Sequence, residues 1–118
     1  MTALAQDFTI WQGEDKSIEV VVYETEEGRI SDLTGAEIEW ICKKRITDTT
    51  ASLTKTTVSG IEVPLGVDGK FKIYLYNTET DDLLGKYYHE AKITLNTQKE
   101  VALTGEMTVV RSGFIPNI

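Results

Sequence analysis

The chain contains one histidine, His89, and one cysteine, Cys42, so the side chains best suited to nucleophilic catalysis occur once each. A hydrolase of the serine, histidine and aspartate type needs a base held beside a nucleophile. His89 stands instead between Tyr87 and Ala91 in the apolar register of a strand. We therefore expect a structural histidine. Cys42 also falls in an apolar register, so we expect a buried, unreactive thiol and no intrachain disulfide.

Carboxylates gather at Glu79, Asp81 and Asp82, but their spacing is not that of a calcium-binding loop. Acidic residues at such positions are typical of the first turn of a helix, where they interact with the positive end of the helix dipole. Gly66 and Gly69 flank a turn and do not form a phosphate-binding loop before a helix. The sequence therefore predicts no catalytic residues, no metal site and no cofactor, and we expect that the protein is not an enzyme.

The net charge is −7 and the isoelectric point is near 4.7, which disfavours two classes of partner. Nucleic acids and anionic membranes are bound through basic surfaces, and Lys43–Arg45 is the only basic run in the sequence. We expect neither partner. Residues 1–7 lack a basic start and a long apolar run, so we also expect no signal peptide and no membrane-spanning segment.

An alternation of apolar and polar residues with a period of two dominates the chain and is clearest over residues 36–44. The apolar face of this segment carries Ala36, Ile38, Trp40 and Cys42. Such a pattern is typical of a half-buried β-strand. A large ring at the centre of the face suggests the core between two packed sheets.

Similar patterns predict further strands at 8–11, 17–23, 53–58, 61–65, 70–76, 86–95 and 100–111. One short helical turn is expected at 77–84, capped by Asn77 or Thr78 and ended by Gly85. Seven to eight short strands spaced about ten residues apart favour an all-β fold, an antiparallel immunoglobulin-like β-sandwich. In the last strand we expect Val101 to point inward and Gly105 to mark a bulge.

The domain is expected to span 7–111, between an N-terminal arm at 1–6 and a C-terminal tail at 112–118 that docks on a partner. The core is predicted to contain Ile38, Trp40, Cys42, Phe71, Ile73, Tyr87 and Ile93. Other apolar side chains face outward or lie in the two ends, which suggests contact with other proteins. These candidate interface residues are Leu4, Phe8, Tyr74, Tyr76, Tyr88, Phe114, Ile115 and Ile118.

Several segments, in this order, resemble a known family. They are residues 8–15 (FTIWQGED), 32–36 (DLTGA), 69–75 (GKFKIYL), 84–91 (LGKYYHEA) and 103–109 (LTGEMTV). Together they resemble the immunoglobulin-like domain at the N-terminus of phage baseplate upper proteins and of related small tailed-phage and prophage virion proteins. Gly85-Lys86-Tyr87 also resembles the tyrosine corner of immunoglobulin-like sandwiches, with His89 where a disulfide cysteine would stand.

The resemblance implies a structural protein of a tailed-phage virion, made in the bacterial cytoplasm. It would be a small adaptor or anchor in the tail, baseplate or neck that contacts other virion proteins and copies of itself. The chain lacks the extension of the large baseplate proteins, which weakens a direct role in host recognition. Two alternatives stay open: a capsid decoration protein, or a carbohydrate-binding module with weak affinity for host glycans through Trp11, Tyr74, Tyr76 or Tyr88.

Overall fold

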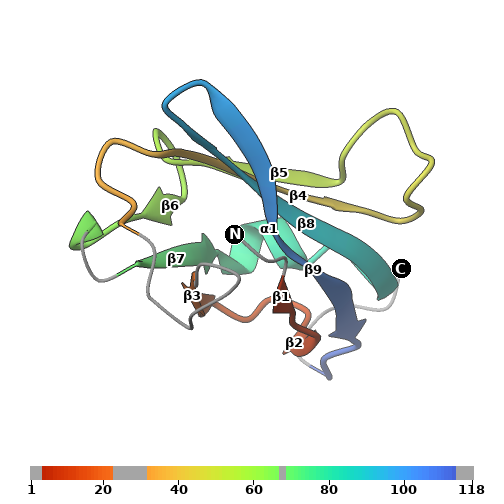
Figure 1. The fold of residues 1–118 in the computed structure, drawn as a ribbon. Helices are drawn as coiled ribbons and strands as arrows, with labels where there is room; N and C mark the ends of the chain where they lie inside the picture. The colour runs from red at the N-terminus through yellow and green to blue at the C-terminus, as the bar shows by residue number, and fades with distance from the viewer. Residues whose placement is uncertain (1–3, 23–31, 67–68, 114–118) are drawn as a thin grey trace.

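A computed structural model describes residues 4–22, 32–66 and 69–113 of the chain. Within these residues the fold is all-β, with two sheets around one core and a single short helical turn (Figure 1). The candidate interface residues Phe114, Ile115 and Ile118 lie outside the described residues.

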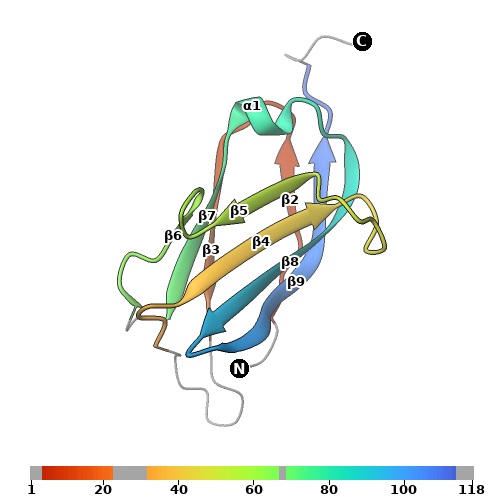
Figure 2. The same cartoon turned by 90° about the horizontal axis from the view of Figure 1, so that it is seen from above.

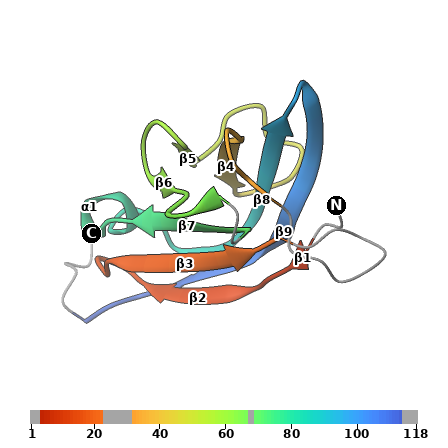
Figure 3. The same cartoon turned by 60° about the vertical axis from the view of Figure 1, so that its left-hand side comes forward.

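Sheet A has six strands in the order β1-β9-β8-β4-β5, with β2 also paired to β9 (Figure 2). The bounds of its strands are Leu4–Ala5 (β1), Phe8–Trp11 (β2), Glu37–Lys43 (β4), Leu53–Thr56 (β5), Gly85–Leu95 (β8) and Gln98–Val110 (β9). Sheet B has the order β3-β7-β6, with Lys16–Val21 (β3), Ile61–Glu62 (β6) and Lys70–Leu75 (β7). The β8–β9 hairpin is long and curls, so that its turn stands away from sheet B (Figure 3).

Sheet A is mixed, which corrects the expectation of a purely antiparallel arrangement. Both β1 and β2 run parallel to β9, whereas the other strand pairs in the two sheets are antiparallel. A hydrophobic period predicts that a segment is extended, but it does not say which neighbour the segment chooses. Residues 4 and 5, which the sequence assigned to an arm, are therefore part of the edge of sheet A.

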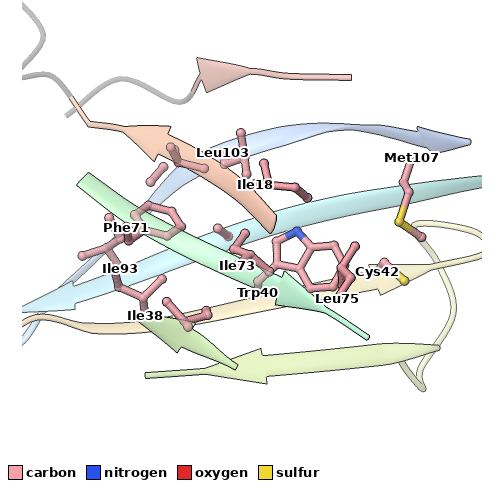
Figure 4. Close-up of a cluster of buried hydrophobic side chains, with 14 of the residues drawn as sticks. Ile18, Ile38, Trp40, Cys42, Phe71, Ile73, Leu75, Ile93, Leu103 and Met107 are labelled. Atoms are coloured by element: carbon pink, nitrogen blue, oxygen red, sulfur yellow. The ribbon is translucent and has the colours of Figure 1, made fainter. Parts of the chain in front are cut away.

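The core lies between the inner faces of the two sheets, and Trp40 is its largest fully buried side chain. Figure 4 shows the indole between β7 of sheet B and β4 of sheet A, close to Ile73 and Leu75. The seven residues expected in the core are all buried: Ile38, Trp40, Cys42, Phe71, Ile73, Tyr87 and Ile93. The alternation in β4 and β7 thus places one face of each strand against the other sheet.

Two details of β9 differ from the expectation. The β8–β9 register shifts between Ala91, which faces Leu103, and Lys92, which faces Val101, so Ala102 has no partner and forms the bulge. Because the extra residue reverses the alternation, Ala102 and Leu103 are both buried and Val101 is exposed. The bulge expected at Gly105 and the inward position of Val101 were both wrong.

The expected helix is shorter than residues 77–84, because α1 spans only Asn77–Thr80. The residue before it is Tyr76, whose backbone N–H donates to the Glu79 carboxylate at 2.9 Å. Asn77 therefore begins the turn, and it does not cap it as expected. The β8–β9 connection is a two-residue turn in which Asn96 and Thr97 both adopt positive φ, as tight hairpins require.

We expect Trp40→Ala to lower the free energy of unfolding by about 3–5 kcal/mol, because it leaves a cavity at the centre of the core. Urea denaturation followed by far-UV circular dichroism measures this change. Trp11→Ala is the matched control, since the Trp11 side chain is 52% exposed and its loss should change stability by about 0.5 kcal/mol or less. Equal effects of the two substitutions would contradict this description of the core.

Candidate functional site

The imidazole of His89 is fully buried, and each of its two ring nitrogens makes a hydrogen bond. The indole N–H of Trp40 donates to His89 Nδ1 at 3.1 Å. An indole nitrogen is a donor only, so Nδ1 must be the acceptor and the ring proton must sit on Nε2. His89 Nε2 lies 2.7 Å from the carbonyl oxygen of Gln6 and therefore donates to it. The ring is neutral and links the core tryptophan to the N-terminal strand.

The bond to Gln6 replaces part of the ladder between the N-terminal strand and β9. Both β1 and β2 pair with β9 at the same offset, so residues 4–11 follow β9 in one continuous register. The Gln6 N–H donates to Thr104 O at 2.9 Å, as a parallel ladder requires. The regular partner of the Gln6 carbonyl would be the N–H of Glu106, but that N–H donates to Asp7 Oδ1 at 2.9 Å. Two side chains, His89 and Asp7, thus complete an interrupted ladder.

Gly105 makes this arrangement possible, because it lies opposite His89 in the register. A Cβ at position 105 would overlap the carbonyl oxygen of Gln6 and come within 2.8 Å of His89 Nε2. Phe8 covers the ring from the same side, with its centroid 5.1 Å from that of His89 and the planes at 71°. Gly105 and His89 therefore form a notch that accepts one peptide carbonyl.

Burial lowers the pKa of His89, and the hydrogen bond to Gln6 and the charge of Asp7 act in the opposite direction. A general base must reach its substrate with a free nitrogen. Both nitrogens of His89 are occupied and the ring has no access to solvent. Cys42, which faces His89 from β4, is no nucleophile either, because burial raises the pKa of its thiol to about 11.

A second buried polar group, Lys55, joins β5 to the helical turn. Its ammonium contacts both carboxylate oxygens of Glu79, at 2.6 and 2.5 Å, and lies 4.9 Å from the centroid of the Tyr76 ring. A Cβ at Gly60 would overlap the Lys55 side chain, so the glycine leaves room for it. Glu79 is thus engaged in an ion pair, and no group of acidic, histidine or cysteine side chains suited to a metal ion occurs in the described part of the chain.

The outward tyrosines do not form a common surface. Tyr74 lies on the outer face of sheet B and donates to Glu62 at 3.0 Å, and this hydrogen bond raises its pKa. Tyr88 lies on the outer face of sheet A, where it donates to Glu90; burial and then this bond raise its pKa to about 12. Tyr76 is half exposed beneath Lys55. Phe8 packs partly against the core, and the side chain of Leu4 is outside the described part.

A hollow of about 500 Å³ opens on sheet A near the ends of β4, β5 and β8. Its rim carries Glu37, Glu39, Lys92 and Lys99, with threonines and Val58 between them. Charges of both signs are balanced there, and no aromatic ring is among the described residues that line it. The described lining of the hollow is mostly polar, and it provides no aromatic ring against which a sugar could stack.

Figure 2 shows that β2 and β9 end on the side of the molecule that carries α1. Three of the seven large apolar side chains that are exposed among the described residues lie at the end of β2, directly before α1 and directly before β8. Trp11, Tyr76 and Leu84 are each about half exposed there. Gln12 ties this end together, because its side chain donates to Leu83 O at 2.8 Å and accepts from the N–H of Ser112 at 3.4 Å. We call Trp11, Tyr76 and Leu84 the apolar end; the described chain stops beside it, at Gly113.

No protein-family model matches the chain, and no curated protein sequence matches it. Within the described residues, no helix has the length and apolar character needed to cross a bilayer. The functional interpretation therefore rests on the geometry above and on the resemblance noted in the sequence.

Sequence reasoning missed both polar links. The inward register of His89 indicated a structural role, but nothing in the sequence pointed to Gln6 as its partner. Lys55 shares the inward face of β5 with Leu53, so the period of two carried a signal for its burial. Lysine side chains are usually exposed to solvent, so the inward register position of Lys55 was not interpreted as burial.

We expect the stability of the protein to fall as the pH drops from 7.5 to 5.5. The folded state holds His89 neutral below the ordinary pKa of about 6.5, whereas the unfolded chain takes up a proton there. Unfolding is therefore favoured by acid, with a slope of at most about 1.4 kcal/mol per pH unit. Urea titrations at several pH values measure the slope, and His89→Phe should be flat over the same range. A wild-type protein equally stable at both pH values would contradict the assignment.

We expect Glu79→Ala to destabilise the protein by about 2 kcal/mol, because it leaves the buried ammonium of Lys55 without its partner. Adding Lys55→Met should recover part of the loss, since methionine keeps the packing of the stem without the charge. A double-mutant cycle on the free energy of unfolding isolates the coupling. Strictly additive effects would show that the pair does not act as a unit.

Proposed function

We propose that this protein is a structural component of a tailed-phage virion that works through protein–protein contacts in several copies. One observation carries the proposal. The buried groups that could do chemistry, His89 and Lys55, hold strands together through hydrogen bonds and an ion pair, whereas Trp11, Tyr76 and Leu84 are exposed at one end. The sequence continues from that end into Phe114-Ile115-Pro116-Asn117-Ile118, which is mostly apolar. Such a combination favours assembly over catalysis.

The proposed fold family is immunoglobulin-like, and three features support it. The strand order β5-β4-β8-β9 opposite β3-β7-β6 fits the order in which the strands of variable-type domains divide between their sheets. The Tyr87 hydroxyl accepts a hydrogen bond from the N–H of Leu84 at 3.2 Å, as in a tyrosine corner. Trp40 packs in the core beside His89, which occupies the place of a disulfide cysteine.

The virion assignment rests on the resemblance of five segments to the baseplate family, and the geometry is compatible with its implications. A small domain with a closed core and an exposed apolar end suits an adaptor or anchor in the tail, baseplate or neck. The same features suit a capsid decoration protein, and the position of the protein in the particle separates the two. In either case the partners would be virion proteins and copies of itself.

The carbohydrate-binding alternative receives less support. A sugar platform needs aromatic rings on one accessible face. Tyr74 and Tyr88 lie on the outer faces of different sheets, and their hydroxyls are engaged by Glu62 and Glu90. Trp11 and Tyr76 are both about half exposed at the apolar end, but the Lys55 ammonium lies over the Tyr76 ring, 4.9 Å from its centroid. Glycan binding through the remaining ring surface would be weak.

The proposal predicts that assembly depends on the apolar end and on residues 114–118. We expect the full chain to enter phage particles in fixed stoichiometry, measured by quantitative mass spectrometry of purified particles. Deletion of 114–118, or the pair Trp11→Ser and Leu84→Ser, should reduce incorporation at least tenfold while circular dichroism stays unchanged. Val58→Ser is the matched control, because that side chain is almost fully exposed away from the apolar end.

Two results would overturn the proposal. One is incorporation that is unaffected by both the deletion of 114–118 and the double substitution at Trp11 and Leu84. The other is a soluble monomer that is absent from particles and binds oligosaccharides in isothermal titration, with affinity lost in Trp11→Ser.

A further inference from the structure

We propose that residues 4–7 form a releasable edge strand locked by His89, and that protonation of this imidazole frees the strand from β9 while the rest of the fold stays closed. The inference stands on the geometry around His89 and does not depend on a role in a virion.

A protonated imidazole does not fit the site as it stands. Nδ1 accepts from the Trp40 indole N–H, so a proton added to Nδ1 would face a second donor at 3.1 Å. The charged ring would then have one protein acceptor, the Gln6 carbonyl, in a pocket that excludes water. A buried charge with unsatisfied donors is strongly unfavourable, so the ring must reach solvent or lose the proton.

The groups that face the ring come from three elements. From β4 come the Trp40 N–H and the thiol of Cys42, which stays neutral because its pKa is raised. From β9 comes Gly105, which has no side chain, followed by Glu106, whose carboxylate lies 3.9 Å from Lys86. From the N-terminal strand comes the carboxylate of Asp7. Its charge favours the protonated ring while the strand is closed, so it partly offsets the cost of the buried charge and opposes the release.

The N-terminal strand is the part that can give way. On one side the ring is covered by Trp40, at the centre of the core; on the other it is covered by Gln6 and Phe8. Ala5 and Asp7 are exposed and Gln6 is only partly buried, so moving residues 5–7 sacrifices little apolar contact. Ile10 is fully buried and holds the rest of β2 in place. Opening the edge is therefore the cheaper route to hydration, as expected for a local opening.

Release would leave one edge of β9 open from Leu103 to Glu106, since these residues face positions 4–7, while the other edge stays paired with β8. An open strand edge presents backbone donors and acceptors to any other strand. The hydrogen bond between His89 and Gln6 therefore controls whether this edge of β9 can pair with another strand.

Two amides report the release directly: the Gln6 N–H, bonded to Thr104, and the Glu106 N–H, bonded to Asp7. Hydrogen exchange followed by NMR gives their protection factors between pH 7.5 and 5. The single histidine of the chain gives an isolated imidazole signal that follows its protonation in the same samples. We expect protection of both amides to fall, by up to about tenfold per pH unit, with the titration of His89. Amides of β4 should keep their protection.

Three variants change the opening in different ways. Trp40→Phe removes the N–H that opposes a proton on Nδ1, so the closed site tolerates the charged ring better and the pH dependence of the opening should weaken. Asp7→Asn removes a charge that favours the imidazolium only in the closed state and weakens the acceptor of the Glu106 N–H, so it should shift the opening to higher pH. Gly105→Ala displaces Gln6 and should expose both amides at pH 7.5. Glu62→Gln, an exposed carboxylate on sheet B, is the matched control and should leave the midpoint unchanged.

The proposal is overturned if the two amides lose protection only together with those of β4, because acid would then unfold the whole domain. It is also overturned if the imidazole titrates while Gln6 and Glu106 stay protected. Should Trp40→Phe fail to fold, the comparison of Asp7→Asn with Glu62→Gln still decides, because Asp7 is exposed and the substitution is nearly isosteric.

Discussion

The hydrogen bond between Trp40 and His89 is the interaction on which the rest of this structure depends. A large indole fills the space between the sheets, but its N–H is then buried, and an unsatisfied buried donor costs about 1–3 kcal/mol. His89 supplies the acceptor at Nδ1 and donates its Nε2–H to the Gln6 carbonyl. Two consecutive hydrogen bonds, Trp40 to His89 and His89 to Gln6, therefore connect the core tryptophan to the edge of sheet A.

The two edges of sheet A are held by the same kind of device. At the β9 edge a neutral buried histidine draws in the N-terminal strand. At the β5 edge an inward-pointing lysine binds Glu79 on the helical turn. Inward charges discourage an edge strand from pairing with another chain. Among the described residues no buried side-chain nitrogen or oxygen lacks a partner, so both devices are fully satisfied. The difference between them is that histidine changes its charge near neutral pH and lysine does not.

The sequence predicts the strands well because a half-buried strand must alternate. The inward faces of β4 and β7 follow directly from the pattern at Trp40 and Phe71. The pairing of strands is harder to predict from the sequence than their positions, because the same alternation in residues 8–11 fits a parallel or an antiparallel neighbour. The bulge at Ala102 was missed for a related reason: one extra residue reverses the face of Val101, and alanine carries no turn signal. The notch at Gly105 needs three segments that lie far apart in the sequence, so no local pattern could reveal it.

The distribution of polar and apolar groups also constrains how this protein can act. Its one histidine, His89, binds the N-terminal strand, and its one cysteine, Cys42, is buried. The carboxylate of Glu79 is paired with Lys55. The hollow on sheet A is balanced in charge, and no aromatic ring is among the described residues that line it, whereas the apolar end exposes the Trp11 indole and the aliphatic side chain of Leu84. Burial of apolar area is the dominant favourable term in protein association. A protein partner would therefore bury more apolar area at the apolar end than in the hollow. This difference favours the proposed role in protein–protein contacts.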